Sequence, residues 1–405
     1  MIPSTRRLSN TETSRRSPRE TKRQGRKPER DPKPWNGSRG CSRHVTESQT
    51  NTCVCNSTDG TVVRLEAHYE SLRARHGYGT VEFGIGDIPP DRLARTFVAV
   101  DGDATDLTDD DTLLATGVGM TGPPHLGTVG QILTMTRLQR AGVDVQFVLA
   151  DLEPYHGGHS LERVRALADR FRAFACDCGF DPDGGGDADG LRTQEEAREV
   201  MHTAQLLAPH YDASHRIETE ATAWEDAVGK AYESAENDTD GPTSEAAAGH
   251  SAVLHRADFL HPLSHGYDRV VLGLGVDEHW LTPATRAFLA AVPDELATGE
   301  IAGLHARMIT GLGDAPKMGR SLPGSAIHLG MAPERIRERL TGSAVDANRP
   351  NDSLAFQAIC LASNYDAAAL DRIETACLEG GEEWERAKRD YATFACDLAV
   401  RWQAC

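Results

Sequence analysis

The sequence predicts an α/β fold, a doubly wound parallel sheet followed by a C-terminal helical domain. Two observations favour this fold class. Short apolar segments alternate with segments of helical period at a spacing typical of strand–helix–strand units, and glycines follow the carboxyl ends of the apolar segments. Ligands of such sheets bind where the parallel strands end, so functional residues are expected in those loops.

The N-terminal part of the predicted fold is weakly patterned. Residues 63–75 have weak helical character, and residues 80–99 predict short strands and turns. The acidic run "DGDATDLTDDD" (101–111) predicts a solvated loop. "TLLATGVGM" (112–120) then predicts a short buried strand that ends in glycines.

The central segments carry the clearest periodicity. Apolar residues recur at helical spacing in "GTVGQILTMTRLQRAGV", and this pattern stops at Gly142. "VDVQFVLADL" (143–152) predicts a second buried strand. "LERVRALADRFRAFACDCG" (161–179) predicts a second helix, which ends at Gly179.

The second half continues the alternation and then becomes helical. Two acidic low-complexity segments, 181–190 and 234–249, predict flexible surface loops. "YDRVVLGLGVDEHW" (267–280) predicts another buried strand, followed by a helix to about Ala291. The remaining helical predictions cover 191–233, 333–340 and 353–403.

Composition divides the chain into four regions. Residues 1–60 have few large apolar side chains and predict a disordered basic tail. We expect an N-terminal segment at 61–111, a catalytic domain with acidic insertions at 112–345, and a short helical domain at 346–405. The first 44 residues carry a net charge of +9. An RNA-binding arm and an overextended gene start before Val45 both fit this tail, and we favour the second.

The rest of the chain is strongly acidic, with a net charge of −27 beyond residue 44. Excess acid with arginine favoured over lysine is typical of proteins solvated in concentrated salt, so we interpret the protein as halophilic. An acid-specific partner is the alternative. An acidic body repels nucleic acid at low salt, so RNA contact needs a local basic site, and DNA is not an expected partner.

The sequence predicts neither a membrane segment nor a metal site. No stretch of 18 apolar residues exists. The C-x-C pairs Cys53/Cys55 and Cys176/Cys178 lack a partner pair at zinc-ribbon spacing. We therefore expect reduced thiols in a cytoplasmic protein.

The segment "TGVGMTGPPHLGTVG" (116–130) predicts a phosphate site. Gly117 and Gly119 are expected to let the backbone turn sharply, and Gly127 to let a ligand approach the next helix. That helix start offers free N–H groups and the positive end of a dipole. His125 is placed to donate an N–H to a phosphate oxygen, although a helix-capping histidine explains the same position. The segment matches neither a P-loop nor a dinucleotide fingerprint.

A second glycine-containing segment, "GLGVDEHW" (273–280), follows the later strand. Gly275 leaves room for a ligand, and the Asp277 carboxylate is suited to bind ribose hydroxyls or an ammonium group. A purely structural turn is the alternative.

The third segment, "DAPKMGRSLPGSAI" (314–327), is too rich in glycine and proline to lie inside a helix. It holds one of only three lysines after residue 44. Lys317 and Arg320, backed by Ser321, are suited to bind the negative charge that develops on a phosphoryl or pyrophosphate leaving group. A solvated surface loop is the alternative.

Together these segments resemble the class I aminoacyl-tRNA synthetases of the HIGH superfamily. "PHLGT" (124–128) is similar to the HIGH signature and "KMGRS" (317–321) to the KMSKS loop, with "GVDEHW" at the family's G-x-D-Q segment. "SLPGSAIHL", "ADLEPY" (150–155) and "CGFDP" (178–182) resemble the archaeal and eukaryotic tryptophanyl branch. The resemblance spans about residues 112–403.

The resemblance implies a Rossmann-like catalytic domain that activates tryptophan with ATP, bound as its magnesium complex, and transfers it to tRNA. It implies a homodimer, with catalytic roles for His125, Lys317 and Arg320. The implied ATP contacts are Pro124, His125, Gly127, Thr128, Gly275, Asp277, Lys317, Met318, Gly319, Arg320 and Ser321. Gly117, Glu153 and Asp277 are the implied amino-acid contacts, with Glu153 at the indole N–H.

Several positions depart from the family pattern. Thr128 replaces the second HIGH histidine, which removes one phosphate contact. Glu278 replaces a glutamine, which turns an amide into a charge. Gly319 and Arg320 replace Ser and Lys, and Arg320 keeps the charge with a different geometry. Ala115 and Val148 stand where the branch has Tyr and Gln, so we expect a roomier and less polar pocket.

These departures keep three alternatives open. "LADLEPY" also resembles tyrosyl enzymes, so tyrosine is the second candidate substrate. A paralogue that binds nucleotide without charging tRNA fits the altered signatures and the short helical end. An adenylyl transferase of the wider HIGH superfamily does not require the Lys317 loop.

Overall fold

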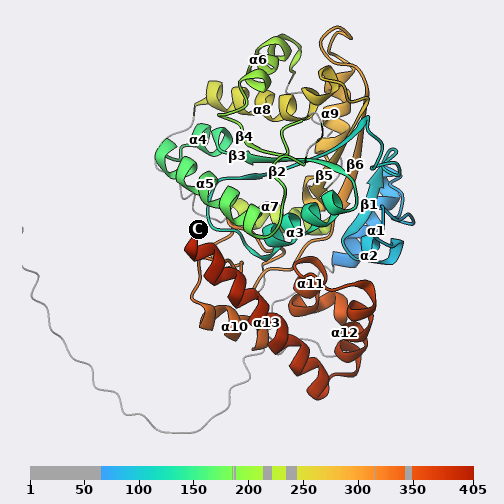
Figure 1. The fold of residues 1–405 in the computed structure, drawn as a ribbon, viewed down its shortest axis with the longest axis vertical. Helices are drawn as coiled ribbons and strands as arrows, with labels where there is room; N and C mark the ends of the chain where they lie inside the picture. The colour runs from blue at the N-terminus through green and yellow to red at the C-terminus, as the bar shows by residue number, and fades with distance from the viewer. Residues whose placement is uncertain are drawn as a thin grey trace, which may run out of the picture. The chain divides into compact units, whose positions relative to one another are not determined.

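A six-stranded sheet with strand order β1-β6-β5-β2-β3-β4 forms the centre of the computed structural model (Figure 1). The structure describes residues 65–184, 186, 188–212, 221–233, 244–313, 315–342 and 349–405. The predicted basic tail and Cys53/Cys55 lie outside these residues. The strands are β1 Phe97–Asp101, β2 Thr112–Gly119, β3 Asp144–Ala150, β4 Leu191–Thr193, β5 Arg269–Gly275 and β6 Glu300–Ala306.

The sheet is parallel except at one edge, where β1 runs antiparallel to β6. β2 pairs in parallel with both β3 and β5. The chain therefore moves outward from β2 through β3 to β4 on one side, and from β5 to β6 on the other. This reversal of strand order between β2 and β5 is the point at which doubly wound sheets bind ligands. The predicted fold class is confirmed.

Alternation along the strands sends apolar side chains to two separate cores. Leu114 and Val118 of β2 join one cluster, whereas Leu113 and Ala115 join the other. Because side chains of a strand point to opposite faces in turn, both faces of a buried parallel sheet must be covered. The first face is covered by α3 (Leu126–Arg140) and α5 (Leu161–Asp177). The second is covered by α6 (Arg198–Leu207), α8 (Glu245–Leu260) and α9 (Leu281–Leu289).

The remaining helices lie before, between and after the strands. They are α1 Leu65–His76, α2 Pro90–Ala94, α4 Leu152–His156, α7 Ala223–Glu233, α10 Pro333–Thr341, α11 Leu354–Leu361, α12 Ala367–Glu379 and α13 Gly381–Ala404. Short 3₁₀ turns are η1 Ala208–His210, η3 Pro262–Ser264, η4 Val276–Glu278 and η5 Pro350–Asp352. No helix among the described residues is long and apolar enough to cross a membrane.

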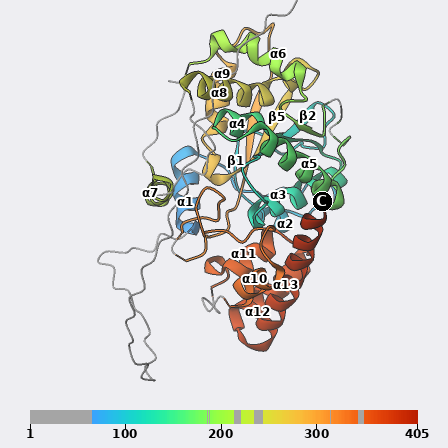
Figure 2. The ribbon, with the colours of Figure 1, turned by 90° about the vertical axis from the view of Figure 1, so that its left-hand side faces the viewer.

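The four C-terminal helices pack on the α3 and α5 side of the sheet, below it in Figures 1 and 2. α11 approaches α3 so closely that a Cβ on Gly130 would lie 2.9 Å from the Leu361 carbonyl oxygen. The Trp402 ring of α13 stands edge-on to Phe171 and Phe174 of α5, at centroid distances of 5.0 and 5.6 Å. The C-terminal helices therefore support α3, whose N-terminus lies at the predicted site.

The predicted helix ends at glycines are confirmed, because Gly142 and Gly179 both have φ of +93° directly after α3 and α5. Other element predictions were wrong. β6 and β4 were not predicted, and α8 begins at Glu245, inside the segment expected to be a flexible loop. β1, in the predicted N-terminal segment, pairs with β6. The expected 345/346 domain boundary lies outside the described residues, and the domain limits stay a prediction.

Candidate active site

The segments predicted to bind nucleotide meet at the switch point of the sheet. A cavity of about 360 Å³ lies between the carboxyl ends of β2 and β5 and the start of α3. Most of the predicted residues line it, namely Gly117, His125, Gly127, Thr128, Gly275, Asp277, Lys317, Met318, Gly319, Arg320 and Ser321. The histidine-led helix start and the lysine-bearing loop thus share one cavity, although they are far apart in the sequence.

His125 caps the N-terminus of α3. Its Nδ1 accepts hydrogen bonds from the backbone N–H groups of Gly127 (3.1 Å) and Thr128 (3.4 Å). Burial, together with the cations Arg320 and Lys317, lowers the pKa of His125 to about 3. The neutral ring therefore carries its proton on Nε2. The capping interpretation is confirmed, and it leaves Nε2–H as the donor expected for a phosphate oxygen.

Lys317 forms an ion pair with Asp277 inside the cavity. The two side chains are only 10% and 16% exposed, so Lys317 does not belong to a solvated surface loop. Burial, the largest single effect, acts to lower the pKa of Lys317, but Asp277 and Tyr232 together outweigh burial and raise the pKa. The Lys317 Nζ also lies 5.1 Å from the ring centroid of Tyr232 on α7. The sequence assigned the two charges to separate parts of ATP, whereas here each neutralises the other.

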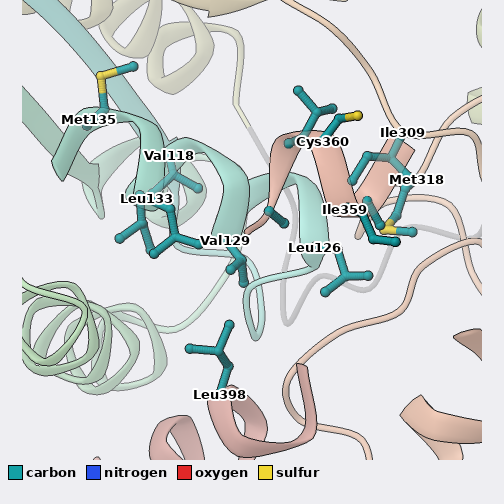
Figure 3. Close-up of a cluster of buried hydrophobic side chains, with 14 of the residues drawn as sticks. Val118, Leu126, Val129, Leu133, Met135, Ile309, Met318, Ile359, Cys360 and Leu398 are labelled. Atoms are coloured by element: carbon teal, nitrogen blue, oxygen red, sulfur yellow. The ribbon is translucent and has the colours of Figure 1, made fainter. Parts of the chain in front are cut away.

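The neighbouring Met318 anchors the loop in the hydrophobic core. Its side chain is 3% exposed and lies beside Ile309 and Ile359 (Figure 3). Its backbone N–H donates to the Ile309 carbonyl at 2.8 Å. Met318 therefore buries its side chain while Lys317 faces the cavity. This alternation fixes the lysine over the end of β5 without a helix or strand.

Backbone hydrogen bonds join the first signature segment to the residues that follow the lysine-bearing signature. The Leu126 N–H donates to the Ile327 carbonyl at 3.0 Å, and the Leu329 N–H donates to the Pro124 carbonyl at 2.9 Å. Pro124 is buried and does not belong to the cavity lining. It was predicted to contact ATP; the structure instead places its carbonyl in this pairing.

Arg320 follows Met318 by two residues in the chain, and it also lines the cavity. Its guanidinium donates to the Gly122 carbonyl at 3.3 Å, in the turn before His125. Burial lowers the pKa of Arg320 to about 10, so the side chain stays cationic at neutral pH. The cavity thus contains two cations and the N-terminus of α3, an arrangement suited to polyphosphate.

A smaller pocket of about 90 Å³ adjoins the larger cavity, which we call the nucleotide cavity after its predicted ligand. The two share Gly117, Val118, Gly119, Leu274 and Glu278, and Glu153 lines only the smaller one. The Gln194 side-chain amide donates to the Glu153 carboxylate (2.9 Å) and to Asp258 (2.8 Å). Val148, Phe259 and Leu274 supply apolar walls. The pocket therefore joins an oriented carboxylate to an apolar surface, as an amino acid with an apolar ring and a polar N–H requires.

Glu278 stands between the cavity and the pocket. Partial loss of hydration, and next the Asp277 carboxylate, raise the pKa of Glu278 above its ordinary value, against the opposing effects of His255 and Lys317. A protonated carboxyl offers one donor and one acceptor, like the amide that it replaces. The predicted conversion of an amide into a charge therefore depends on pH.

Two expectations from the sequence need correction, one about the glycines of β2 and one about the amino-acid pocket. Gly117 and Gly119 do not form a sharp turn, because both belong to strand β2. At Gly117 the need for glycine is a close approach, since a Cβ there would lie 3.0 Å from the Val148 carbonyl oxygen. Ala115 packs in the core and does not line the smaller pocket, whereas Val148 does.

Sequence reasoning missed Gln131 and Tyr232, which also line the nucleotide cavity. Gln131 donates to the Thr116 hydroxyl (2.7 Å) and to the Gly117 carbonyl (3.0 Å), and so ties α3 to β2. Its spacing of three residues from Thr128 put it on the same helix face, which was a usable signal. No local pattern marked Tyr232, since α7 reaches the site only through tertiary packing.

Comparisons with known proteins agree with this geometry. The family model "tRNA synthetases class I (W and Y)" matches residues 108–349. The chain has no match among curated protein sequences. Three solved structures illustrate the shared fold. Tryptophanyl-tRNA synthetase from Aeropyrum pernix has 19% identity and a TM-score of 0.62 over 84% of this chain and 94% of its own.

The other two structures contain different bound amino acids, tryptophan in one and tyrosine in the other. Tryptophanyl-tRNA synthetase from Encephalitozoon cuniculi, bound to tryptophan, has 15% identity and a TM-score of 0.60, over 83% of this chain and 93% of its own. Tyrosyl-tRNA synthetase from Archaeoglobus fulgidus, with L-tyrosine, has 16% identity and a TM-score of 0.52, over 82% and 98%. Because the family match covers more than half of the sequence, the chain belongs to the class I tRNA synthetases of the W and Y family.

Proposed function

We propose that this protein is a tryptophan–tRNA ligase that activates tryptophan with ATP and transfers it to tRNA. The observation that carries the proposal is the shared cavity of His125, Asp277 and Lys317, joined to a smaller pocket that holds Glu153. Family membership supports the reaction class, and the two adjoining cavities support separate sites for ATP and tryptophan.

ATP occupies the larger cavity with its phosphates at the start of α3. The Nε2–H of His125 donates to a phosphate oxygen, and the positive end of the α3 dipole adds to the attraction. When ATP binds, Lys317 leaves Asp277 for the pyrophosphate group. Asp277 then accepts hydrogen bonds from the ribose hydroxyls. Each charge of the ion pair therefore gains a partner on the nucleotide in exchange for the one that it loses.

Activation follows from position and charge, without a covalent protein intermediate. A carboxylate oxygen of tryptophan forms a bond to the α-phosphorus, while the bond from that phosphorus to the bridging oxygen breaks. The leaving pyrophosphate takes the electron pair, and its growing negative charge is stabilised by Lys317 and Arg320. The products are tryptophanyl-adenylate and pyrophosphate. A hydroxyl at the 3′ end of the tRNA then forms a bond to the acyl carbon while the bond from that carbon to the adenylate oxygen breaks. AMP leaves with the electron pair, and the hydroxyl loses its proton.

Tryptophan rather than tyrosine is the proposed substrate. The apolar walls of the smaller pocket suit an indole, and the Glu153 carboxylate suits its N–H. The fold neighbours from Aeropyrum and Encephalitozoon, both tryptophanyl enzymes, have higher TM-scores than the tyrosyl enzyme. The proposal includes magnesium bound with ATP, a homodimer, and a cytoplasmic, salt-adapted protein, in line with the acidic composition.

ATP–pyrophosphate exchange with each of the twenty amino acids tests the proposal. We expect exchange with tryptophan above all others, in high-salt buffer. A preference for tyrosine would reassign the substrate within the family. Charging of total tRNA then separates a ligase from a nucleotide-binding paralogue, because the paralogue would give no aminoacyl-tRNA.

A further inference from the structure

Two histidines and a glutamate converge on a separate cavity, on the α6 and α8 side of the sheet. This cavity of about 290 Å³ shares no lining residue with the nucleotide cavity. Its walls include Glu199 in the first turn of α6, His261 directly after α8, and His265 directly after η3. One possible ligand atom from each of these three side chains lies within 4.8 Å of the other two.

Hydrogen bonds fix the orientation of both imidazoles. The Nδ1 of His261 lies 2.8 Å from the Thr203 hydroxyl. The Nδ1 of His265 lies 3.0 Å from the His261 carbonyl oxygen and 2.9 Å from the Ser264 hydroxyl. In metal sites a ligating histidine almost always uses its second ring nitrogen in this way, which sets the tautomer and the ring orientation. Among the described residues, Nε2 of both rings stays available to a ligand.

The two rings are also close enough to share one ligand. Their centroids lie 3.9 Å apart, at an interplanar angle of 36°. Glu199 and His265 are exposed and His261 is half-buried, so an ion can enter from solvent. The cavity is also lined by Arg192, whose charge is neutralised by Asp258 at 2.8 Å. Its other charged lining residues are Asp189, Glu196, Arg198 and Glu199.

We propose that Glu199, His261 and His265 bind one divalent transition-metal ion, for which Zn²⁺ is the reference. Imidazole nitrogen suits zinc, nickel and copper, whereas Mg²⁺ takes oxygen ligands. Two histidines, one carboxylate and a water form a known four-coordinate zinc set.

The geometry requires only small movements of the ligands. Zinc–nitrogen bonds of about 2.0–2.1 Å place tetrahedral donors about 3.3 Å apart, so the exposed Glu199 and His265 side chains move inward on binding. The ion links the start of α6 to the turn after α8. This site departs from our expectation, made from the sequence, that the protein has no metal ligands.

Titration of the full chain, freed of metal by a chelator, tests the site. We expect calorimetry to show one Zn²⁺ per chain, unaffected by excess Mg²⁺. Co²⁺ should give the visible absorption bands of a tetrahedral ion. His265→Ala and Glu199→Gln should each weaken Zn²⁺ binding at least tenfold. Thr203→Val, which keeps all three ligands, should weaken it by about 10–100-fold because His261 loses its orienting partner.

The matched control is His202→Ala, which removes an exposed imidazole of α6 outside the cluster. It should bind Zn²⁺ like the unaltered chain. Saturating Zn²⁺ should raise the Tm of the unaltered chain by about 3–5 °C and leave that of His265→Ala unchanged. An equal Tm of the two chains without metal shows that His265→Ala folds. Absence of binding, or equal binding by His265→Ala and the unaltered chain, would overturn the proposal without affecting the proposed function.

Discussion

Lys317, in the loop after β6, and Asp277, directly after β5, form an ion pair within the nucleotide cavity. The pair holds the loop over the strand ends before nucleotide arrives. If Lys317 binds pyrophosphate and Asp277 binds ribose, the pair must separate when ATP binds. Each charge then exchanges one partner for another, so neither is left unpaired in the low-dielectric cavity.

Lys317→Ala removes the charge that stabilises the leaving group in the proposed mechanism. We expect the rate of tryptophan activation to fall by about 10²-fold or more, since a preorganised charge contact is worth that much in the transition state. ATP–pyrophosphate exchange at saturating ATP measures the effect. Lys230→Ala, at an exposed lysine of α7, is the matched control and should keep the parent rate. An unchanged rate for Lys317→Ala would show that the loop takes no part in activation.

Asp277→Asn leaves the buried Lys317 without its counter-charge. We expect the free energy of unfolding to fall by about 1–3 kcal/mol, between the values for exposed and fully buried ion pairs. Urea denaturation in the absence of nucleotide measures it. The double variant Asp277→Asn/Lys317→Met should recover part of this loss, because no unpaired charge remains. Strictly additive losses would contradict the pairing.

Glu278→Gln should change how stability depends on pH. An ordinary glutamate has a pKa of 4.5, whereas the pKa of Glu278 is raised in the folded protein. Above pH 4.5 the folded state therefore binds more protons than the unfolded state until Glu278 itself ionises, so Glu278 makes stability fall as pH rises through this range. The variant lacks this loss. Its unfolding free energy relative to the parent should therefore increase as pH rises above 4.5, as denaturation at several pH values would show. A difference independent of pH would contradict the raised pKa.

Glu153→Gln tests recognition of the indole N–H. A charge-assisted hydrogen bond is about twice as strong as a neutral one, so kcat/KM for tryptophan should fall by about tenfold. The KM for ATP should not change, because Glu153 lines only the smaller pocket. Exchange kinetics with each substrate varied in turn separate the two effects. A change confined to ATP would place Glu153 elsewhere in the mechanism.

Gly130→Ala tests the contact between α3 and the C-terminal helices. The added Cβ would lie 2.9 Å from the Leu361 carbonyl oxygen, so we expect a loss of about 1–3 kcal/mol in unfolding free energy. Gly229→Ala, inside α7 and with no neighbour within 4 Å, is the control. It should be neutral or stabilise by about 0.5–1 kcal/mol, as alanine does in a helix. Chemical denaturation compares the two variants.

Most of the residues that line the larger cavity could be predicted because the patterns that mark them are local in the sequence. His125 precedes a helical pattern and caps the helix that follows, and Lys317 stands out because lysine is scarce. Their common cavity was inferred from the resemblance to the HIGH and KMSKS segments, and the structure places both residues in one cavity. The ion pair with Asp277 was not predictable. It depends on where the loop lies over β5, which no short pattern encodes.

The sequence analysis missed strands where the local preference for a strand was weak. β4 has only three residues, and β6 contains Gly303, a residue with low strand propensity. Gly303 is required by packing, since a Cβ there would lie 2.6 Å from the Thr282 hydroxyl. α8 did carry a signal, because Ser244 caps it by accepting from the Ala247 N–H. The acidic residues before it concealed that signal.

The central claim is that one cavity, with His125 on one wall and Lys317 on another, forms an aminoacyl-adenylate. Pyrophosphate exchange by the full chain, with each amino acid supplied singly, tests it most directly. The account predicts exchange that requires tryptophan and is lost in Lys317→Ala. Exchange with no amino acid, or equal exchange by the parent and Lys317→Ala, would contradict it.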